Sequence, residues 1–307
     1  MNEGTPNGGE LSGLAVVIPC HNERESVLRC VASLARDIEL GCKIFVVDDG
    51  STDGVAEAVA HLAPSVNVSR GDGSLWWSGA VNLGIEVAIE HGSSIIALLN
   101  NDCVLSGDDL SVLVRRCRSD PRLILSPAIV DLANDRSVSF GGRIGGRGVE
   151  YWTTCPPLDS AGLASVDWLP GHLMVADFRV FRALGLFDNR AFAHYWADVD
   201  FSLRAARLGY RLAVDTSVHV ANDRSQTGLL LAYPIRLNNV WKMLTSRRSY
   251  LRVDEALRFW WRHRSVVQGS GMIRRYGGIF RGIGRQVLEP LHLTSAAPSS
   301  DAQNRTR

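Results

Sequence analysis

A run of apolar residues that ends abruptly in oxygen-bearing side chains is the feature that most constrains this chain. Ile95 to Leu99 are all apolar, and Asn100, Asn101 and Asp102 follow at once. An uninterrupted apolar run of this length is typical of a strand buried on both faces, as in the middle of a parallel sheet. Ligands of such sheets bind just beyond the carboxyl ends of the strands, so we expect a functional site here.

Carboxylate and amide oxygens at this position suit a divalent metal ion. Mg²⁺ and Mn²⁺ are commonly bound by one or two carboxylates together with the phosphates of a substrate. The alternative is an ordinary turn after the strand, because Asn and Asp are also frequent in turns. The stretch from Asn100 to Asp102 leaves both interpretations open.

Apolar and polar segments alternate along the chain in a way that predicts an α/β fold. We expect strands at 14–18, 43–47, 66–68 and 95–99, with helices at 25–35, 55–62 and 79–90. Further on, we expect helices at 108–118, 178–184 and 199–208 and extended segments at 123–130, 167–175, 211–214 and 218–220. Residues 137–157 form a glycine-rich loop or hairpin region, and the pattern is helical from 228 onward. Strands alternating with helices predict βαβ units and a parallel sheet.

The charge of the chain is balanced in total but unevenly distributed. Its 307 residues are 46% hydrophobic and carry a net charge of +1, which fits a globular protein and gives no sign of nucleic-acid binding. Residues 242–285 hold eleven Lys and Arg against two acidic residues, a net charge of +9, which leaves −8 on the remainder. The segments 258–264 and 274–276 indicate basic amphipathic helices. These helices either dock on an anionic membrane or pack on the protein with their arginines in water.

Cysteine usage and the chain ends favour a cytoplasmic location. The six cysteines form no C-x-x-C pair and no Cys/His cluster, which argues against zinc and disulfide frameworks. Residues 1–13 are polar and lack the apolar core of a signal peptide. No apolar run approaches the roughly twenty residues needed to cross a bilayer. We therefore expect a cytoplasmic protein, with peripheral contact to the inner face of the membrane if the basic helices bind lipid.

Acidic or polar clusters follow three predicted strand ends, which a single sheet would bring together. They are Asp48/Asp49, Asn100/Asp102 and Asp198/Asp200. Crowded carboxylates are tolerated only when a cation is present or when their pKa values split. Gly71-Asp72-Gly73 matches neither the Walker nor the Rossmann fingerprint, which argues against an NTPase or a dehydrogenase.

Five segments, taken in order, resemble family 2 of the inverting glycosyltransferases, which have the GT-A fold. The segments are 16–23, 46–53, 82–85, 98–102 and 198–204, and the resemblance covers residues 14–220. The sequence from Gly73 to Gly79 is similar to a subset that includes bacterial rhamnosyltransferases and other cell-surface glycan enzymes. The resemblance implies an α/β fold of GT-A type, with a mostly parallel central sheet flanked by helices and, here, a C-terminal helical extension.

The resemblance also implies an organisation of the chain. Residues 1–13 would be a disordered N-terminus, 14–103 the nucleotide-sugar-binding half and 104–227 the acceptor-binding and catalytic half. Residues 228–293 would be the basic helical extension, and 294–307 a disordered tail rich in Ser, Asn and Asp.

The resemblance implies donor-binding roles for seven residues. They are Pro19, Glu23, Asp49, Arg70, Trp77, Asn82 and Asn100. Asp49 would contact the base or the ribose, and the alternative is a turn that caps the next helix. Arg70 would pair with a donor phosphate or lie on the surface. Of Trp76 and Trp77 we expect one ring at the site, against the C–H face of a sugar, and one in the core.

The metal site implied by the resemblance is incomplete in this sequence. Asn100 to Asp102 stands where the family has its D-x-D motif, with Asn100 in place of the first Asp. Asp102 is therefore the surer contact to Mg²⁺ or Mn²⁺, and strict metal dependence is left open. His219 would complete the metal site or donate to the diphosphate; the alternative is a buried structural histidine between Val218 and Val220.

Asp198 is the expected general base. It matches the Asp of the family's Glu-Asp pair, although the Glu position is Ala197 here. One carboxylate near the acceptor hydroxyl is enough to take its proton, and one base without a covalent intermediate gives inversion. Asp200 competes for this role, with an i to i+4 salt bridge to Arg204 as its alternative. The acceptor-side residues would be Trp168, Gly171 and His172.

The sequence thus indicates a metal-assisted, inverting glycosyltransferase. It would move a sugar from a nucleotide diphosphate donor, either dTDP-rhamnose or a UDP-sugar, to a hydroxyl of a glycan or lipid-linked acceptor in cell-surface polysaccharide synthesis. Asn100 and Ala197 leave a catalytically silent nucleotide-sugar-binding or interaction protein as the alternative. A nucleotidyltransferase is a third interpretation, and it predicts pyrophosphate release from a nucleoside triphosphate.

Overall fold

The structure is a computed structural model that describes residues 9–134, 136–145, 148–223, 237–271, 273–274, 276–278 and 281. Its strands are β1 (Leu14–Cys20), β2 (Lys43–Asp48), β3 (Asn67–Arg70), β4 (Ile95–Leu99), β5 (Cys103–Val104), β6 (Leu123–Asp131), β7 (Ser137–Ser139), β8 (Gly142–Gly145), β9 (Gly148–Tyr151), β10 (Leu163–Ser165), β11 (Leu173–Asp177) and β12 (Arg211–Asn222). Its helices are α1 (Arg24–Ser33), α2 (Ala35–Glu39), α3 (Val55–Leu62), α4 (Trp76–Glu90), α5 (Asp109–Ser119), α6 (Phe178–Leu184), α7 (Ala197–Arg207), α8 (Leu237–Thr245) and α9 (Val253–His263).

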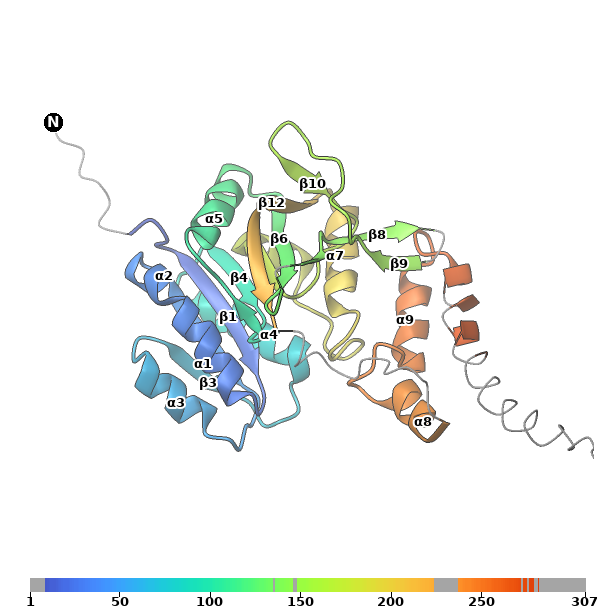
Figure 1. Cartoon of the computed structure of the whole chain (residues 1–307), viewed down its shortest axis with the longest axis horizontal. Helices are drawn as coiled ribbons and strands as arrows, with labels where there is room; N and C mark the ends of the chain where they lie inside the picture. Colours follow the sequence, from blue (N-terminus) through green and yellow to red (C-terminus); the bar gives the residue numbers. More distant parts are fainter. Residues whose placement is uncertain are drawn as a thin grey trace, which may run out of the picture.

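A ten-stranded sheet runs through the centre of the fold (Figure 1). Its strands lie in the order β10-β12-β6-β11-β4-β1-β2-β3, while β5 pairs with β12 and β7 with β6. β1 is parallel to both β2 and β4, and β2 is parallel to β3, as the alternation of strands and helices predicted. A separate two-stranded hairpin, β8–β9, lies at the side where α9 is found in Figure 1.

The sheet reverses direction at β11. This strand is antiparallel to both of its neighbours, β4 and β6, whereas β6 and β12 run parallel to each other. β6 and β12 therefore point the same way as the four strands of the N-terminal half, and the central sheet is mostly parallel. Because one continuous sheet joins residues 14–103 to 104–227, the division into two halves stays a prediction.

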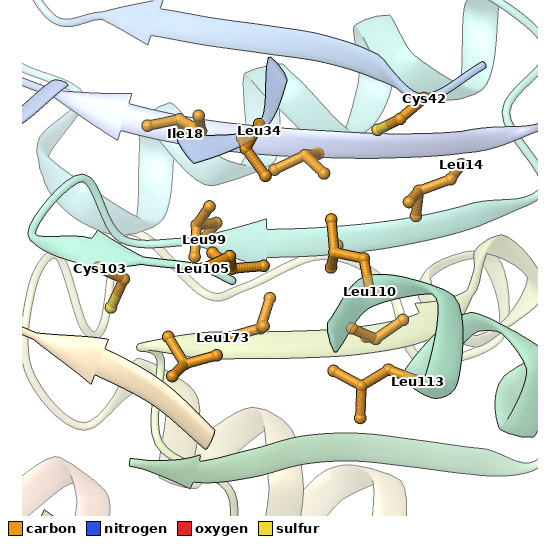
Figure 2. Packing of buried hydrophobic residues seen from close by; sticks show 14 of the residues in the cluster. Leu14, Ile18, Leu34, Cys42, Leu99, Cys103, Leu105, Leu110, Leu113 and Leu173 are labelled. Carbon is orange, nitrogen blue, oxygen red and sulfur yellow. The ribbon is translucent and has the colours of Figure 1, made fainter. Parts of the chain in front are cut away.

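Helices cover both faces of the sheet because the strand residues alternate between two hydrophobic layers. Val16 and Ile18 of β1 face the layer of α1, α3 and α5, and Ala15 and Val17 face the layer of α4, α6 and α7. All seven residues of β1 and all five of β4 are buried, as expected for strands covered on both faces. Figure 2 shows the first layer, in which side chains of β1, β4 and β11 pack with leucines of α5.

Some element boundaries differ from the predicted ones. The predicted helix at 25–35 is two helices, α1 and α2, and the predicted helix at 79–90 begins earlier, at Trp76. Residues 9–13 belong to the folded domain, since Leu11 is fully buried and donates its backbone N–H to the Leu40 oxygen at 2.9 Å. The rest of the predicted disordered N-terminus and the whole predicted tail, 294–307, lie outside the described residues.

The C-terminal part contains the expected helices. α8 and α9 lie within the predicted extension, 228–293, of which residues 228–236, 272, 275, 279–280 and 282–293 lie outside the described residues. In the part of the chain that the structure describes, no helix combines the length and the apolar character needed to cross a membrane.

Candidate active site

The carboxyl ends of β1, β2 and β4 lie side by side, as the sequence predicted, whereas Asp198 and Asp200 lie in α7 and do not follow a strand end. The last residue of β1, Cys20, pairs with Asp48 at the end of β2, and Asp49 follows directly. On the other side of β1, β4 ends at Leu99, and the next residue, Asn100, donates its backbone N–H to the His172 oxygen at 2.9 Å. This bond joins the predicted metal segment to the predicted acceptor segment.

The Asp49 carboxylate caps the N-terminal end of helix α4. Its carboxylate is 4% exposed and accepts the backbone N–H groups of Gly73 at 2.9 Å, Leu75 at 3.2 Å and Trp76 at 2.9 Å. These bonds satisfy donors at the beginning of α4 that have no partner within the helix. The capping alternative therefore describes the observed contacts better than contact with the base, except that the capped helix is α4 rather than α3. A donor contact of Asp49 stays a prediction.

The side chain of Trp77 connects the donor side to the acceptor side. Its Nε1–H donates a 2.7 Å hydrogen bond to the Asn100 amide oxygen, and its ring lies against Gly171. A Cβ atom added at Gly171 would lie 2.8 Å from the ring, so only glycine fits there without a shift. Gly171 in turn donates its backbone N–H to the Asp198 carboxylate at 3.1 Å.

Asp198 has the environment of a general base. It lies in the first turn of α7, is half-buried, and accepts the backbone N–H groups of Gly171 and, at 2.8 Å, Val199. Burial raises the pKa of its carboxyl from 3.8 to about 6, and the hydrogen bonds oppose only part of this rise. A carboxylate with a pKa near neutrality is well matched to removing a proton from a hydroxyl group.

Two tyrosines near Asp198 were not predicted as site residues. Burial raises the pKa of Tyr195, with the negative charge of Asp198 as a smaller contribution, whereas Tyr151 is 51% exposed and lies near the same carboxylate. The ring of Tyr151, at the end of β9, meets the ring of Trp168 edge-on at 4.8 Å. Tyr151 belongs to the glycine-rich segment 137–157, whose aromatic residues were the signal in the sequence that could have found it; no such signal accompanies Tyr195.

Asp200 does not compete with Asp198, because its carboxylate is turned into the protein. It is 1% exposed and forms the predicted i to i+4 salt bridge with Arg204 at 2.9 Å. Its carboxylate also accepts hydrogen bonds from His263 and Arg262 of α9. Although burial opposes ionisation, the His263 hydrogen bond and the charges of Arg204 and Arg262 lower the pKa of Asp200.

Two predicted donor residues have other partners. Arg70 is exposed and forms an ion pair with Glu57 on the surface, which agrees with the alternative weighed for it. The Asn82 side chain donates to the Phe187 oxygen at 2.8 Å and accepts the Phe187 N–H at 3.0 Å. Because the oxygen and the nitrogen of this amide both form hydrogen bonds with the backbone, Asn82 holds the segment before α7 in place.

The remaining predicted donor residues, Pro19 and Glu23, lie at and just after the end of β1. Pro19 is buried, and Glu23 accepts a hydrogen bond from the Asn101 amide.

His219 is exposed on β12, so the alternative of a buried structural histidine is wrong. Burial raises the pKa of Asp109 on α5, and the nearby His219 counteracts part of that rise. Asp223, just after β12, contacts the predicted metal segment: its backbone N–H donates to the backbone oxygen of Asp102 at 2.8 Å. A metal-binding role for His219 stays a prediction.

The residues near Asp102 fit a metal ion only with help from a substrate. Among the described residues, no group of three or more His, Cys, Asp and Glu side chains is arranged to hold a metal ion. Asp102 is half-buried and contributes one carboxylate, while the Asn100 oxygen already accepts the Trp77 N–H. This donor set suits Mg²⁺ or Mn²⁺ bound by one carboxylate, with phosphates and water as the other ligands.

Sequence comparisons agree with this geometry. The family model described as "Glycosyl transferase family 2" matches residues 15–140. An uncharacterized glycosyltransferase of Mycobacterium tuberculosis is 26% identical over 247 residues, which cover 76% of this chain and 98% of the relative. An N-acetylglucosaminyl-diphospho-decaprenol L-rhamnosyltransferase of the same species is 24% identical over 289 residues, which cover 86% of this chain and 92% of the relative.

Solved structures share the fold. GalNAc-T7 with UDP, GalNAc and Mn²⁺ superimposes with a TM-score of 0.58 at 18% identity, over 71% of this chain and 44% of that one. This chain thus spans less than half the length of that protein. The mannosyltransferase PcManGT from Pyrobaculum calidifontis, in complex with GDP-Man and Mn²⁺, superimposes with a TM-score of 0.53 at 16% identity. The superposition covers 93% of this chain and 76% of that one. The expected GT-A fold is confirmed. The chain is a glycosyltransferase, and residues 15–140 are similar to glycosyltransferase family 2, with a rhamnosyltransferase among the relatives.

Proposed function

We propose that this enzyme transfers a sugar, with inversion, from a nucleotide diphosphate donor to a hydroxyl group of a lipid-linked acceptor or a glycan in cell-surface polysaccharide synthesis. The observation that carries the proposal is the position of Asp198, a half-buried carboxylate with a raised pKa. It is connected through Gly171 and Trp77 to Asn100, at the edge of the sheet where Asp102 also lies.

In the proposed reaction, Asp198 accepts the proton of the acceptor hydroxyl as the oxygen attacks the anomeric carbon of the donor sugar. The bond from that carbon to the diphosphate breaks on the opposite side, and the nucleoside diphosphate leaves. Because a single carboxylate acts as base and no sugar becomes attached to the protein, the anomeric configuration inverts. Asp102 would hold Mg²⁺ or Mn²⁺ against the donor diphosphate, and the ion would neutralise the charge of the leaving group.

Donor and acceptor are assigned to opposite sides of Trp77. We place the nucleotide and its diphosphate near Pro19, Glu23, Asn100 and the first turn of α4, which Asp49 caps. The name of one relative, an N-acetylglucosaminyl-diphospho-decaprenol L-rhamnosyltransferase, supports rhamnose as the transferred sugar and an N-acetylglucosaminyl-diphospholipid as the acceptor.

The acceptor sugar would lie between two groups of residues around Asp198. One group is the segment Trp168 to His172, and the other contains Tyr151 and Tyr195. Aromatic rings offer apolar faces to the C–H groups of a sugar, and tyrosine adds a hydroxyl for hydrogen bonding.

A lipid-linked acceptor would require the enzyme to work at a membrane surface. The outward face of α9 exposes Val253, Leu257 and Trp261, which are 36%, 47% and 63% accessible and repeat every fourth residue. The Arg264 guanidinium lies 4.4 Å from the centre of the Trp261 ring. An apolar stripe within a strongly basic segment is suited to peripheral contact with anionic lipid at the inner face of the cell membrane.

A transfer assay tests the proposal. The purified protein is incubated with dTDP-rhamnose or UDP-sugars, an N-acetylglucosaminyl-diphospholipid and Mg²⁺ or Mn²⁺. We expect release of nucleoside diphosphate together with a glycosylated product whose anomeric configuration, determined by NMR, is inverted. Nucleotide binding without release of diphosphate would favour a catalytically silent protein, and pyrophosphate release from a nucleoside triphosphate would favour a nucleotidyltransferase.

A further inference from the structure

The inner face of α9 packs against α7, the helix that carries Asp198. Ala256, Phe259 and His263 lie on this face, and each is at most 2% exposed. In Figure 1, α9 (orange) lies to the right of α7 (yellow), which separates it from the central sheet. The contacts between the two helices are polar as well as apolar.

The polar contact is centred on the Asp200 carboxylate. His263 donates its Nε2–H to this carboxylate at 2.8 Å, and Arg262 donates to the same oxygen at 3.1 Å. The other ring nitrogen of His263, Nδ1, accepts a 3.0 Å hydrogen bond from Arg207. Because a guanidinium can only donate, this geometry assigns the imidazole proton to Nε2, facing Asp200. α9 is thereby fixed to the first turn and the end of α7.

The apolar contact lies at the beginning of α7. The ring of Phe259 packs against the ring of Trp196 in a tilted arrangement, with 4.5 Å between their centres and 32° between their planes. Trp196 has a φ of +70°, a left-handed backbone conformation that is uncommon for a bulky residue and that surrounding contacts must enforce. Its oxygen accepts the Asp200 N–H at 2.8 Å, and Asp198 is two residues further along. The turn that aims Asp198 is therefore covered by α9.

The segment before this turn is held from the opposite side by α4. The Ser78 hydroxyl donates to the Phe192 oxygen at 2.6 Å, and the Ser78 N–H donates to the Ala193 oxygen at 3.0 Å. Arg258 of α9 donates to the Ala191 oxygen at 2.9 Å. The segment that leads into α7 thus lies between the helix of the donor side and the C-terminal helix.

We propose that α9 is a positioning element of the active site, in which Phe259 and His263 hold the first turn of α7 so that the Asp198 carboxylate faces the acceptor. The two hydrogen bonds that Asp198 accepts come from the backbone of Gly171 and Val199, so its direction follows the backbone of this turn. The proposal rests on the role of Asp198 as general base. It gives a helix outside the region matched by the family model an indirect part in the reaction, through the backbone that orients Asp198.

The test compares His263→Ala with His263→Gln in the full-length protein. Loss of the Nε2 donor should lower kcat by roughly ten- to a hundredfold, because small displacements of a reacting group have effects of this size. The KM for the donor should change less than twofold, since the donor side does not depend on this contact. The His263→Gln variant, whose side-chain N–H reaches a similar position, should recover most of the lost kcat.

Two further measurements separate positioning from simple loss of stability. The acid limb of the pH–rate profile should move below pH 6 in His263→Ala, because a displaced Asp198 is better solvated. The control variant Arg116→Gln breaks a different ion pair of a buried aspartate, Arg116 with Asp215, between α5 and β12. This variant should lose stability and keep both kcat and the pH profile of the parent protein.

An unchanged kcat and pH profile in folded His263→Ala would overturn the proposal, as would an equal loss of kcat in Arg116→Gln. If His263→Ala does not fold, Phe259→Leu provides the same test through the Trp196 contact. The assay also includes Asp198→Asn, to separate this proposal from the proposed function. An active Asp198→Asn would refute the function itself, whereas an inactive Asp198→Asn beside a fully active His263→Ala would refute only the positioning role.

Discussion

The indole N–H of Trp77 donates a 2.7 Å hydrogen bond to the side-chain oxygen of Asn100, the residue that stands where family members have an aspartate. The bond fixes the amide so that its oxygen points to the indole. The single oxygen of Asn100 therefore has a protein partner, and Asp102 is left as the carboxylate of this segment. An aspartate at position 100 would offer a second oxygen and a negative charge while keeping the bond to Trp77.

This relationship predicts that Asn100→Asp strengthens metal binding. A second carboxylate raises the affinity of an oxygen site for a divalent cation, so we expect the Mn²⁺ concentration for half-maximal activity to fall by about tenfold. Titration of activity with Mn²⁺ at fixed donor concentration measures this effect. Asn101→Asp is the matched control, because Asn101 donates to Glu23 and a carboxylate there would meet a like charge. Equal metal dependence in Asn100→Asp and the parent would contradict the proposed metal site.

The pKa of Asp198 predicts how the rate depends on pH. As a base, Asp198 is active only when ionised, and burial raises its pKa to about 6. The rate of transfer should therefore increase about tenfold per pH unit below 6 and level off above it. Steady-state kinetics between pH 4.5 and 8.5 measure this profile. A plateau that extends down to pH 4.5 would show that a different group limits the reaction.

The same carboxylate predicts a gain in stability when Asp198 is replaced by Asn. A carboxyl whose pKa is higher in the folded state than in the unfolded state loses its favourable contribution as the pH rises through 4 to 6. The free energy of unfolding of Asp198→Asn should exceed that of the parent above pH 6, by at most about 3 kcal/mol, and should approach it near pH 4. Denaturant unfolding at both pH values measures the difference. The variant should lose transfer activity by about 10²- to 10⁴-fold while still binding the donor nucleotide.

The close approach of Trp77 to Gly171 predicts that Gly171→Ala impairs transfer. The added methyl group would lie 2.8 Å from the indole, so either the ring or the backbone that donates to Asp198 must move. We expect kcat to fall by at least about tenfold. Gly145→Ala is the control, since a Cβ there has only ordinary contacts, at 3.7 Å. Similar kinetics for the two variants would mean that the Gly171 contact has no role in the reaction.

Features that depend on local sequence were predictable. The apolar runs of β1 and β4 gave their positions, and the spacing of Asp200 and Arg204 gave their salt bridge, because a residue and its neighbour four positions on share one helix face. The family resemblance added the fold and the order of the strand ends along the chain. These predictions needed no knowledge of which distant segments meet.

Features that depend on distant contacts were not predictable from one sequence. An apolar run does not indicate its direction, so the reversal at β11 could not be foreseen. The Asp49 carboxylate caps a helix that begins 27 residues later, whereas the local signal pointed to the helix directly after it. His263 and Asp200 are 63 residues apart in the sequence, and the residues around them contain no pattern that predicts their contact.

The outward face of α9 provides a test of the proposed contact with anionic membranes. Replacing Leu257 and Trp261 by Ser should weaken binding to vesicles that contain phosphatidylglycerol by more than tenfold. The reason is that burying each side chain in the lipid would contribute roughly 1.5–3 kcal/mol to the binding free energy. Co-sedimentation with anionic and zwitterionic vesicles, at low and high salt, measures the effect. Leu62→Ser on α3 is the control, because Leu62 is 47% exposed and lies outside the basic segment.

Point substitutions are the better test of this prediction than removal of residues 242–307. A truncation would also take Phe259 and His263 away from α7, so a loss of binding or activity would have two causes. The two faces of α9 make separate predictions: outward substitutions should change vesicle binding and leave transfer to a water-soluble acceptor intact, and inward ones should do the reverse. Unaltered binding of the Leu257/Trp261 variant, or equal binding of the parent to zwitterionic vesicles in high salt, would contradict membrane docking through this helix.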